Sequence, residues 1–190
     1  MKASYCMIGC LVLAACGAIH PVKDKAVHHL LQPRVGERNL TLSTPVVAVK
    51  QPSLPVYLDR QQLVSRLNDR FSISNTDLWA EPLAAGVSRV VSCNLRRLSG
   101  SMRIQPVESY TSLDYSRLLE IRVSRFDVDD FGLMIFEGTW QLQNVKGESS
   151  PLHFFHIKVP PYMGTMKANV QVDSMSRALE ILSRQICGGM

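Results

Sequence analysis

The chain has 190 residues, of which 46% are hydrophobic, and this length suits one domain with a real hydrophobic core. Its 21 lysines and arginines exceed its 16 acidic residues, which gives a formal net charge of +5. This excess is too small to indicate a nucleic-acid-binding protein, although it suits a protein close to anionic lipid headgroups.

Residues 1–16 have the pattern of a bacterial export signal. Lys2 supplies a short positive region, an apolar run of about ten residues follows, and Leu13-Ala14-Ala15-Cys16 closes the run. Small residues before a cysteine are typical of the lipobox, the cleavage signal of lipoproteins. We therefore predict a signal peptide over 1–15, cleavage between Ala15 and Cys16, and lipidation of Cys16 by acyl groups such as palmitate.

Two other interpretations of this segment exist. The uncharged stretch over 3–19 is close to the shortest length that spans a bilayer, so it could be an uncleaved anchor. It could also be an ordinary signal that is cleaved elsewhere. The lipobox explains the small residues before Cys16, which an anchor does not need. An aspartate directly after the lipidated cysteine tends to retain lipoproteins in the inner membrane. Gly17 occupies this position, which favours anchoring in the outer membrane with the domain facing the periplasm.

We divide the remaining chain into a lipidated flexible tether over 16–39 and a folded domain over 40–190. The tether is rich in proline, glycine and charged residues, and fully extended it would reach about 75 Å. His28 and His29 lie within it, where we expect solvated side chains rather than a metal site.

The first elements of the domain have mixed signals. Residues 46–49 predict a strand that ends before Pro52. Asp59 followed by Gln62 has the spacing of a capping box, so we predict a helix from Asp59 to about Asn68. A short strand is expected over 71–73.

The next helix has the clearest pattern. Glu81-Pro82 suits a helix start, and Gly100 suits its end. Apolar residues then recur at helical spacing, with Arg96 and Arg97 near the C-terminal end, where cations are favoured.

After this helix the apolar residues alternate. We predict strands over roughly 102–106, 115–128, 133–145 and 152–159, and a final helix over 172–186. Short turns join the long strands, which predicts an antiparallel meander. The order is β-α-β-α-β-β-β-β-α, and we expect an α+β fold in which helices cover one face of a mixed, largely antiparallel sheet.

No catalytic or metal site is predicted. Asp127 begins an acidic turn, but Phe131 and Gly138 stand where a calcium loop needs oxygen ligands. His153 and His156 fall on opposite faces of a strand. The nucleophile, zinc-protease and nucleotide-binding motifs are absent, so we predict neither an enzyme nor a cofactor.

Two groups of residues have alternative interpretations. Cys93 and Cys187 could form a disulfide in an oxidising periplasm or remain two thiols. Aromatic and charged residues beside the predicted helix starts are either core residues or contacts for a partner protein. The candidate partner-binding residues are Tyr57, Arg60, Trp79 and Glu81.

Several segments resemble the PqiC/YmbA family of ABC-transport auxiliary lipoproteins. Residues 54–66 (LPVYLDRQQLVSR) are similar to the family's LPxYLDRPQIVxR segment, and residues 78–83 (LWAEPL) to its RWAEPL segment. The resemblance continues through 123–147 and 175–186 and covers about 40–187. Gln61 replaces the family's proline, and Leu78 replaces an arginine, which puts a partner contact at Leu78 in doubt.

The resemblance implies a non-enzymatic outer-membrane lipoprotein subunit of an MCE-type lipid transport system. Its partners would be an MCE-domain protein that spans the periplasm and an inner-membrane protein. The family also implies ring-like homo-oligomers and a role in membrane integrity. The alternative function is a periplasmic carrier that holds an acyl chain within one protomer, and an envelope enzyme is a third class.

Overall fold

The computed structural model describes residues 25–42, 45–107, 114–146, 148, 150–161 and 167–190. The predicted cleavage and lipidation sites at Ala15 and Cys16 lie outside these residues. The elements are β1 (Val27–His29), β2 (Val47–Lys50), β3 (Gln62–Leu67), β4 (Arg70–Trp79), α2 (Leu83–Ser99), β5 (Ile104–Val107), β6 (Arg117–Val128), β7 (Met134–Asn144), β8 (His153–Val159) and α3 (Ala168–Gly188).

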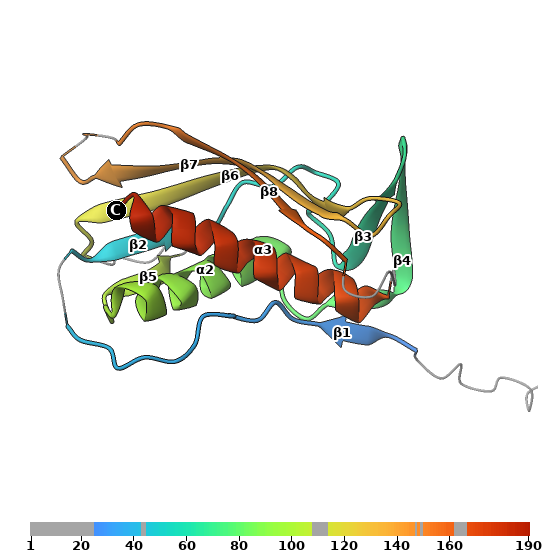
Figure 1. Cartoon of the computed structure of the whole chain (residues 1–190), viewed down its shortest axis with the longest axis horizontal. Helices are drawn as coiled ribbons and strands as arrows, with labels where there is room; N and C mark the ends of the chain where they lie inside the picture. Colours follow the sequence, from blue (N-terminus) through green and yellow to red (C-terminus); the bar gives the residue numbers. More distant parts are fainter. Residues whose placement is uncertain (1–24, 43–44, 108–113, 147, 149, 162–166) are drawn as a thin grey trace, which may run out of the picture.

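The strands form two sheets. The larger sheet has the order β5-β2-β6-β7-β8, and the smaller sheet has the order β1-β4-β3. Strand β2 is parallel to both of its neighbours, whereas β6, β7 and β8 form an antiparallel meander. Figure 1 shows both helices on one side of the larger sheet and the β3–β4 hairpin standing at one end. The α+β fold with a mixed, largely antiparallel sheet is therefore confirmed.

The core lies between the two helices and the larger sheet. Helices α2 and α3 pack against each other, and their apolar stripes are buried. The rings of Phe126 and Phe136 lie 4.2 Å apart, and Phe155 extends this aromatic row at 4.8 Å. Gly100 ends α2 with a φ of 71°, the left-handed conformation that glycine adopts most readily. The second predicted helix and the four strands after it are thus confirmed.

The predicted helix from Asp59 to Asn68 is wrong. Residues 55–60 form a tight turn in which Leu58 N–H donates to the Pro55 carbonyl, and β3 follows. Strand β3 pairs with β4, which has ten residues rather than the short strand expected over 71–73. Asn68 makes the connecting turn with a φ of 54°. A helix over this segment would forfeit the cross-strand pairs with β4, so tertiary pairing overrides the local helix signals.

Part of the segment predicted as a flexible tether over 16–39 is also folded. Strand β1 pairs in parallel with residues 77–79 of β4, and Leu31 and Val35 are buried. Asn94 Oδ1 accepts hydrogen bonds from the backbone N–H groups of Arg34 and Val35. The segment over 27–35 therefore belongs to the folded domain, because it buries apolar side chains against α2 that water would otherwise surround.

Neither of the two helices within the described residues combines the length and the apolar character that crossing a bilayer requires.

Candidate partner-binding site

Three of the four predicted partner-binding residues line one shallow depression of about 240 Å³. We call it the Arg60 depression. It lies where the turn before β3 meets the junction between β4 and α2. Trp79 N–H donates to the Gln61 carbonyl at 2.6 Å, and Ala80 N–H donates to the His29 carbonyl at 2.9 Å. Its lining residues are Asp59, Arg60, Gln61, Trp79, Ala80, Glu81, Pro82 and Leu83.

Trp79 and Glu81 each have an internal structural contact. The Trp79 side chain is 7% exposed and belongs to the core cluster. Glu81 Oε1 accepts a hydrogen bond from Arg89 at 2.6 Å, and Arg89 also donates to the Leu31 carbonyl at 2.8 Å. This ion pair holds the segment after β1 against α2. Both side chains therefore stabilise the walls of the depression.

Arg60 differs from these two neighbours. Its Nε atom is buried and has no hydrogen-bond partner among the described residues. A buried donor without an acceptor costs about 1–3 kcal/mol, and more when the group is charged. Arg60 thus lines the depression with a cationic side chain whose buried Nε has no internal acceptor among the described residues.

Tyr57 points away from the depression, into a polar cluster beneath the β3–β4 hairpin. Its hydroxyl donates to Asp127 Oδ2 at 2.7 Å, and Arg125 Nε donates to Asp127 Oδ1 at 2.9 Å. Arg66 adds two longer hydrogen bonds at 3.4 Å to the same carboxylate, whose side chain is fully buried. Burial, followed by the hydrogen bond to Asp127, raises the pKa of Tyr57 to about 12.

The aromatic part of this cluster joins the hairpin to the larger sheet. The rings of Tyr57 and Phe71 stack at 4.4 Å, and the Arg66 guanidinium lies 4.8 Å from the centre of the Phe71 ring. The sequence predicted only an acidic turn at Asp127, so the role of Asp127 as the buried acceptor of this cluster was missed. The signal was a carboxylate two residues from Arg125 within a predicted strand, a spacing that places both side chains on one face.

The family model for the ABC-type transport auxiliary lipoprotein component matches residues 29–187. The chain belongs to this family. No curated protein matches the sequence.

Solved structures support the fold of this auxiliary lipoprotein. An uncharacterised protein is 22% identical with a TM-score of 0.66, over 80% of this chain and 96% of that one. A protein from Xanthomonas campestris, assigned to DUF330, is 16% identical with a TM-score of 0.63, over 84% and 92% of the two chains. The PelC dodecamer from Paraburkholderia phytofirmans is 14% identical with a TM-score of 0.42, over 78% and 94%. The first two likenesses show a shared fold.

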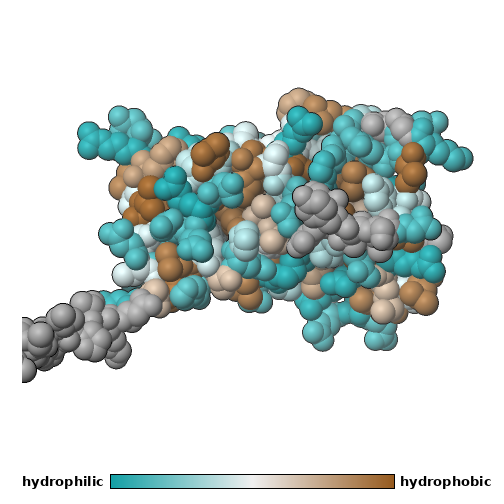
Figure 2. Space-filling view, turned by 180° about the vertical axis from the view of Figure 1, so that it is seen from behind, coloured by the Kyte–Doolittle hydropathy of each residue, from teal (hydrophilic) through white to brown (hydrophobic). Residues whose placement is uncertain are grey.

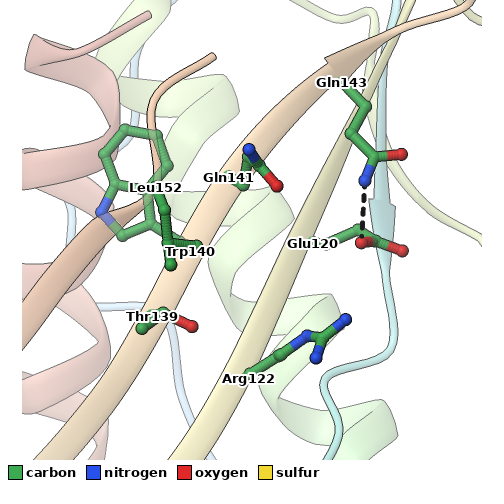
Figure 3. A pocket seen from close by; sticks show the side chains of 7 residues that line it. All are labelled: Glu120, Arg122, Thr139, Trp140, Gln141, Gln143 and Leu152. Carbon is green, nitrogen blue, oxygen red and sulfur yellow. Dashed lines mark hydrogen bonds between the residues drawn. The ribbon is translucent and has the colours of Figure 1, made fainter. Parts of the chain in front are cut away.

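The auxiliary lipoprotein has a second, polar hollow on the outer face of the larger sheet (Figure 3). It measures about 340 Å³ and includes Glu120, Arg122 and Gln143. Gln143 Nε2 donates to Glu120 Oε2 at 3.1 Å, and Lys50 Nζ donates to Glu120 Oε1 at 2.7 Å. Charged and amide side chains of this kind suit a polar partner surface better than an acyl chain.

The other residues considered in the sequence analysis have ordinary structural contacts. The ring of His153 stacks on Trp140 at 4.1 Å, whereas His156 pairs with Glu137 at 2.8 Å on the other face of β8, as the strand assignment predicted. The acidic hairpin turn is confirmed, because Asp129 Oδ1 accepts hydrogen bonds from two backbone N–H groups within it. Cys93 and Cys187 are unpaired and half-buried.

The sequence predicts a solvated His29 side chain, but His29 has a specific partner in the structure. Its Nε2 atom lies 2.8 Å from Asp77 Oδ1 and joins β1 to β4. Within the part of the chain that the structure describes, no cluster of His, Cys, Asp and Glu is arranged to hold a metal ion.

Proposed function

We propose that this auxiliary lipoprotein is a non-enzymatic outer-membrane subunit of an MCE-type intermembrane lipid transport system. Acylated Cys16 holds it in the membrane, and the domain docks the MCE-domain protein that spans the periplasm, which in turn works with an inner-membrane partner. This docking aligns the end of a lipid path with the outer membrane and supports envelope integrity.

The observation that carries the proposal is the family match over residues 29–187, which covers the folded domain. The Leu13-Ala14-Ala15-Cys16 motif supports the lipid anchor, since cleavage there would make Cys16 the first residue of the mature protein.

The acyl-chain carrier is less well supported. A carrier needs a sizeable apolar cavity within one protomer. Between the helices and the larger sheet, the space is filled by fully buried side chains, including Leu95, Phe126, Phe136 and Leu179. The Arg60 depression and the hollow beside Glu120 are open and partly lined by polar side chains.

For the docking contact we propose the Arg60 depression, with Arg60 donating to a carboxylate or carbonyl of the partner. Trp79 and Glu81 would shape this surface. Tyr57 would act indirectly, by holding the turn that carries Arg60. A ring of several copies would repeat this surface around the end of the partner.

The proposal is tested by purifying the acylated protein from native membranes and identifying its companions and their stoichiometry by native mass spectrometry. Co-purification of an oligomer with an MCE-domain protein supports docking, whereas a monomer with bound phospholipid supports the carrier. Cys16→Ala should shift the protein from the outer membrane to a soluble or precursor form. Unchanged fractionation of this variant contradicts the lipid anchor.

A matched pair of variants tests the docking surface. Arg60→Ala should lower capture of the MCE-domain protein, because it removes the cationic side chain that lines the depression. Arg184→Ala is the control, since Arg184 lies on exposed α3 surface and pairs with Glu180. Equal capture by both variants contradicts a role for the depression.

A further inference from the structure

Five exposed apolar side chains belong to segments that meet at one end of the domain, two of them (Phe71 and Ile73) on one face of the β3–β4 hairpin and Leu67 on the other. We call this the apolar end, and it consists of Val56, Leu67, Phe71, Ile73 and Phe131. Val56 and Phe131 are 86% and 84% exposed. Clustered apolar side chains on a surface mark an interaction site more often than scattered ones do.

Specific contacts join the three segments that carry these side chains. Phe71 stacks on Tyr57, which follows Val56 in the turn before β3. The N–H of Asn68, at the tip of the β3–β4 hairpin, donates to Asp130 Oδ1 at 2.7 Å, and Phe131 follows Asp130. The apolar end is therefore a continuous part of the fold.

The apolar end lies on the side of the molecule that carries β1, the first described strand. Figure 1 shows the β3–β4 hairpin and β1 at the same end, opposite the C terminus. Figure 2, seen from behind, shows hydrophobic side chains at this end. Strand β1 is joined to β4 by its pairing with residues 77–79.

The length of chain before β1 limits how far this end can lie from a lipid anchor. Nine residue steps separate Cys16 from Lys25, the first described residue, and they span at most about 30 Å. The 21-residue helix α3 is itself about 31 Å long, so the opposite end of the domain lies roughly one helix length further away.

We propose that the apolar end rests on the lipid bilayer that holds acylated Cys16, an inference that depends on the proposed lipidation. Phe131, Val56 and the hairpin side chains enter the boundary between headgroups and acyl chains, where apolar surfaces of peripheral proteins are buried by about 5–10 Å. The acyl chains hold the protein in the membrane, and this contact sets its orientation.

A lipid surface fits this position better than a protein partner or a second copy. Any protein on the apolar end would have to fit within the roughly 30 Å that residues 16–25 can span between this end and the membrane. The Arg60 depression stays available, because Trp79 lies nine residues from Arg70, about 30 Å along β4 from the hairpin tip.

The test uses the full-length acylated protein in vesicles of phosphatidylethanolamine and phosphatidylglycerol, with and without brominated acyl chains that quench tryptophan emission. Phe131→Trp places a probe at the apolar end. Val145→Trp is the matched control, because Val145 is 66% exposed and follows β7, whereas Phe131 precedes it. The native Trp79 and Trp140 are buried and give a constant background.

We expect Phe131→Trp to lose emission in brominated vesicles and Val145→Trp to keep it. If both variants float with the vesicles but respond equally, the inference is overturned while the lipid anchor stands. If neither floats, the proposed anchor itself fails, and the inference fails with it. If the probe at position 131 is already shielded in lipid-free oligomers, a second copy covers this end and the inference is overturned.

A second probe guards against a folding defect. Phe131 lies in an exposed turn, so its tryptophan variant should melt at the wild-type temperature. Val56→Trp places a probe in a separate exposed turn of the same surface and should lose emission in the same vesicles. If Val56→Trp is not quenched, the inference is overturned.

Discussion

The two sheets of this protein are held in different ways. The larger sheet buries its apolar face under α2 and α3, so packing of many side chains stabilises it. In the smaller sheet, most β4 residues before Asp77 are exposed. Its connections to the rest of the domain include the buried Leu63, Val64 and Trp79 and a few specific hydrogen bonds, such as Arg66 to Asp127 and Gln171 to the Val64 carbonyl.

This difference has a consequence for stability. Substitutions in the larger sheet should change the free energy of unfolding by altering the volume of packed side chains, and this change should depend little on pH. Substitutions at the polar contacts around the smaller sheet should act through single hydrogen bonds, so their effects should be smaller and should change with pH. Trp79, at the end of β4, belongs to the common core and should behave like the larger sheet.

The largest effect on stability is expected for Trp79, where β4 joins the common core. Trp79→Ala removes a buried indole and should lower the free energy of unfolding by about 3–5 kcal/mol, measured by denaturant titration. Phe131→Ala is the control, since removing an exposed apolar side chain should change the free energy of unfolding by about 0.5 kcal/mol or less. A stable Trp79→Ala variant that loses partner capture would instead make Trp79 a partner contact.

Within the larger sheet, Gly138→Ala should cost roughly 3 kcal/mol. A Cβ at this position would lie 2.1 Å from the Arg122 carbonyl oxygen and 2.7 Å from the Phe155 ring, so the backbone would have to move. Gly36→Ala is the matched control, because a Cβ added at Gly36 would meet nothing within 4 Å. Equal unfolding midpoints for the two variants would contradict the close packing of β6, β7 and β8.

At the smaller sheet, Tyr57→Phe should cost about 1–2 kcal/mol near neutral pH, because it removes one hydrogen bond to a buried carboxylate. The pKa of Tyr57 is raised from 10.0 to about 12, so its contribution is complete below pH 10 and is lost as the pH rises towards 12. Unfolding titrations across this range should show the wild type approaching the variant. A constant difference would contradict the buried hydrogen bond.

The smallest effect is expected for β1. His29→Ala should lower stability by about 0.5–1 kcal/mol, because it removes a partly exposed pair with Asp77. The hydrogen bond from His29 lowers the pKa of Asp77 from 3.8, so its contribution is present above that pH and is lost as the pH falls through the lowered value. Hydrogen exchange of the β1 amides should report the loosening, with β7 amides as the unaffected control.

Local patterns predicted most of the larger sheet and both helices. The apolar stripe of α2, its glycine end and the alternation of β6, β7 and β8 depend on residues that are neighbours in the chain. The same patterns predicted a helix where β3 lies, because Asp59 and Gln62 have helix-start spacing whatever they later pair with.

The candidate sites divide in the same way. The sequence singled out Arg60, Trp79 and Glu81 beside predicted helix starts, and the structure brings them into one depression. The Asp127 cluster and the β1 strand were missed. Their decisive contacts join residues far apart in the chain, 70 positions for Tyr57 and Asp127 and 48 for His29 and Asp77.

The sequence by itself therefore determined the α+β class, α2, α3 and the meander, since the period of apolar residues is a local property of a chain. Only the tertiary structure decided that residues 27–35 join the domain, that residues 62–67 form a strand and that an apolar end lies on the same side as β1. Each of these depends on which distant backbone groups and side chains meet, and the free energy of such pairing is not encoded in any local pattern.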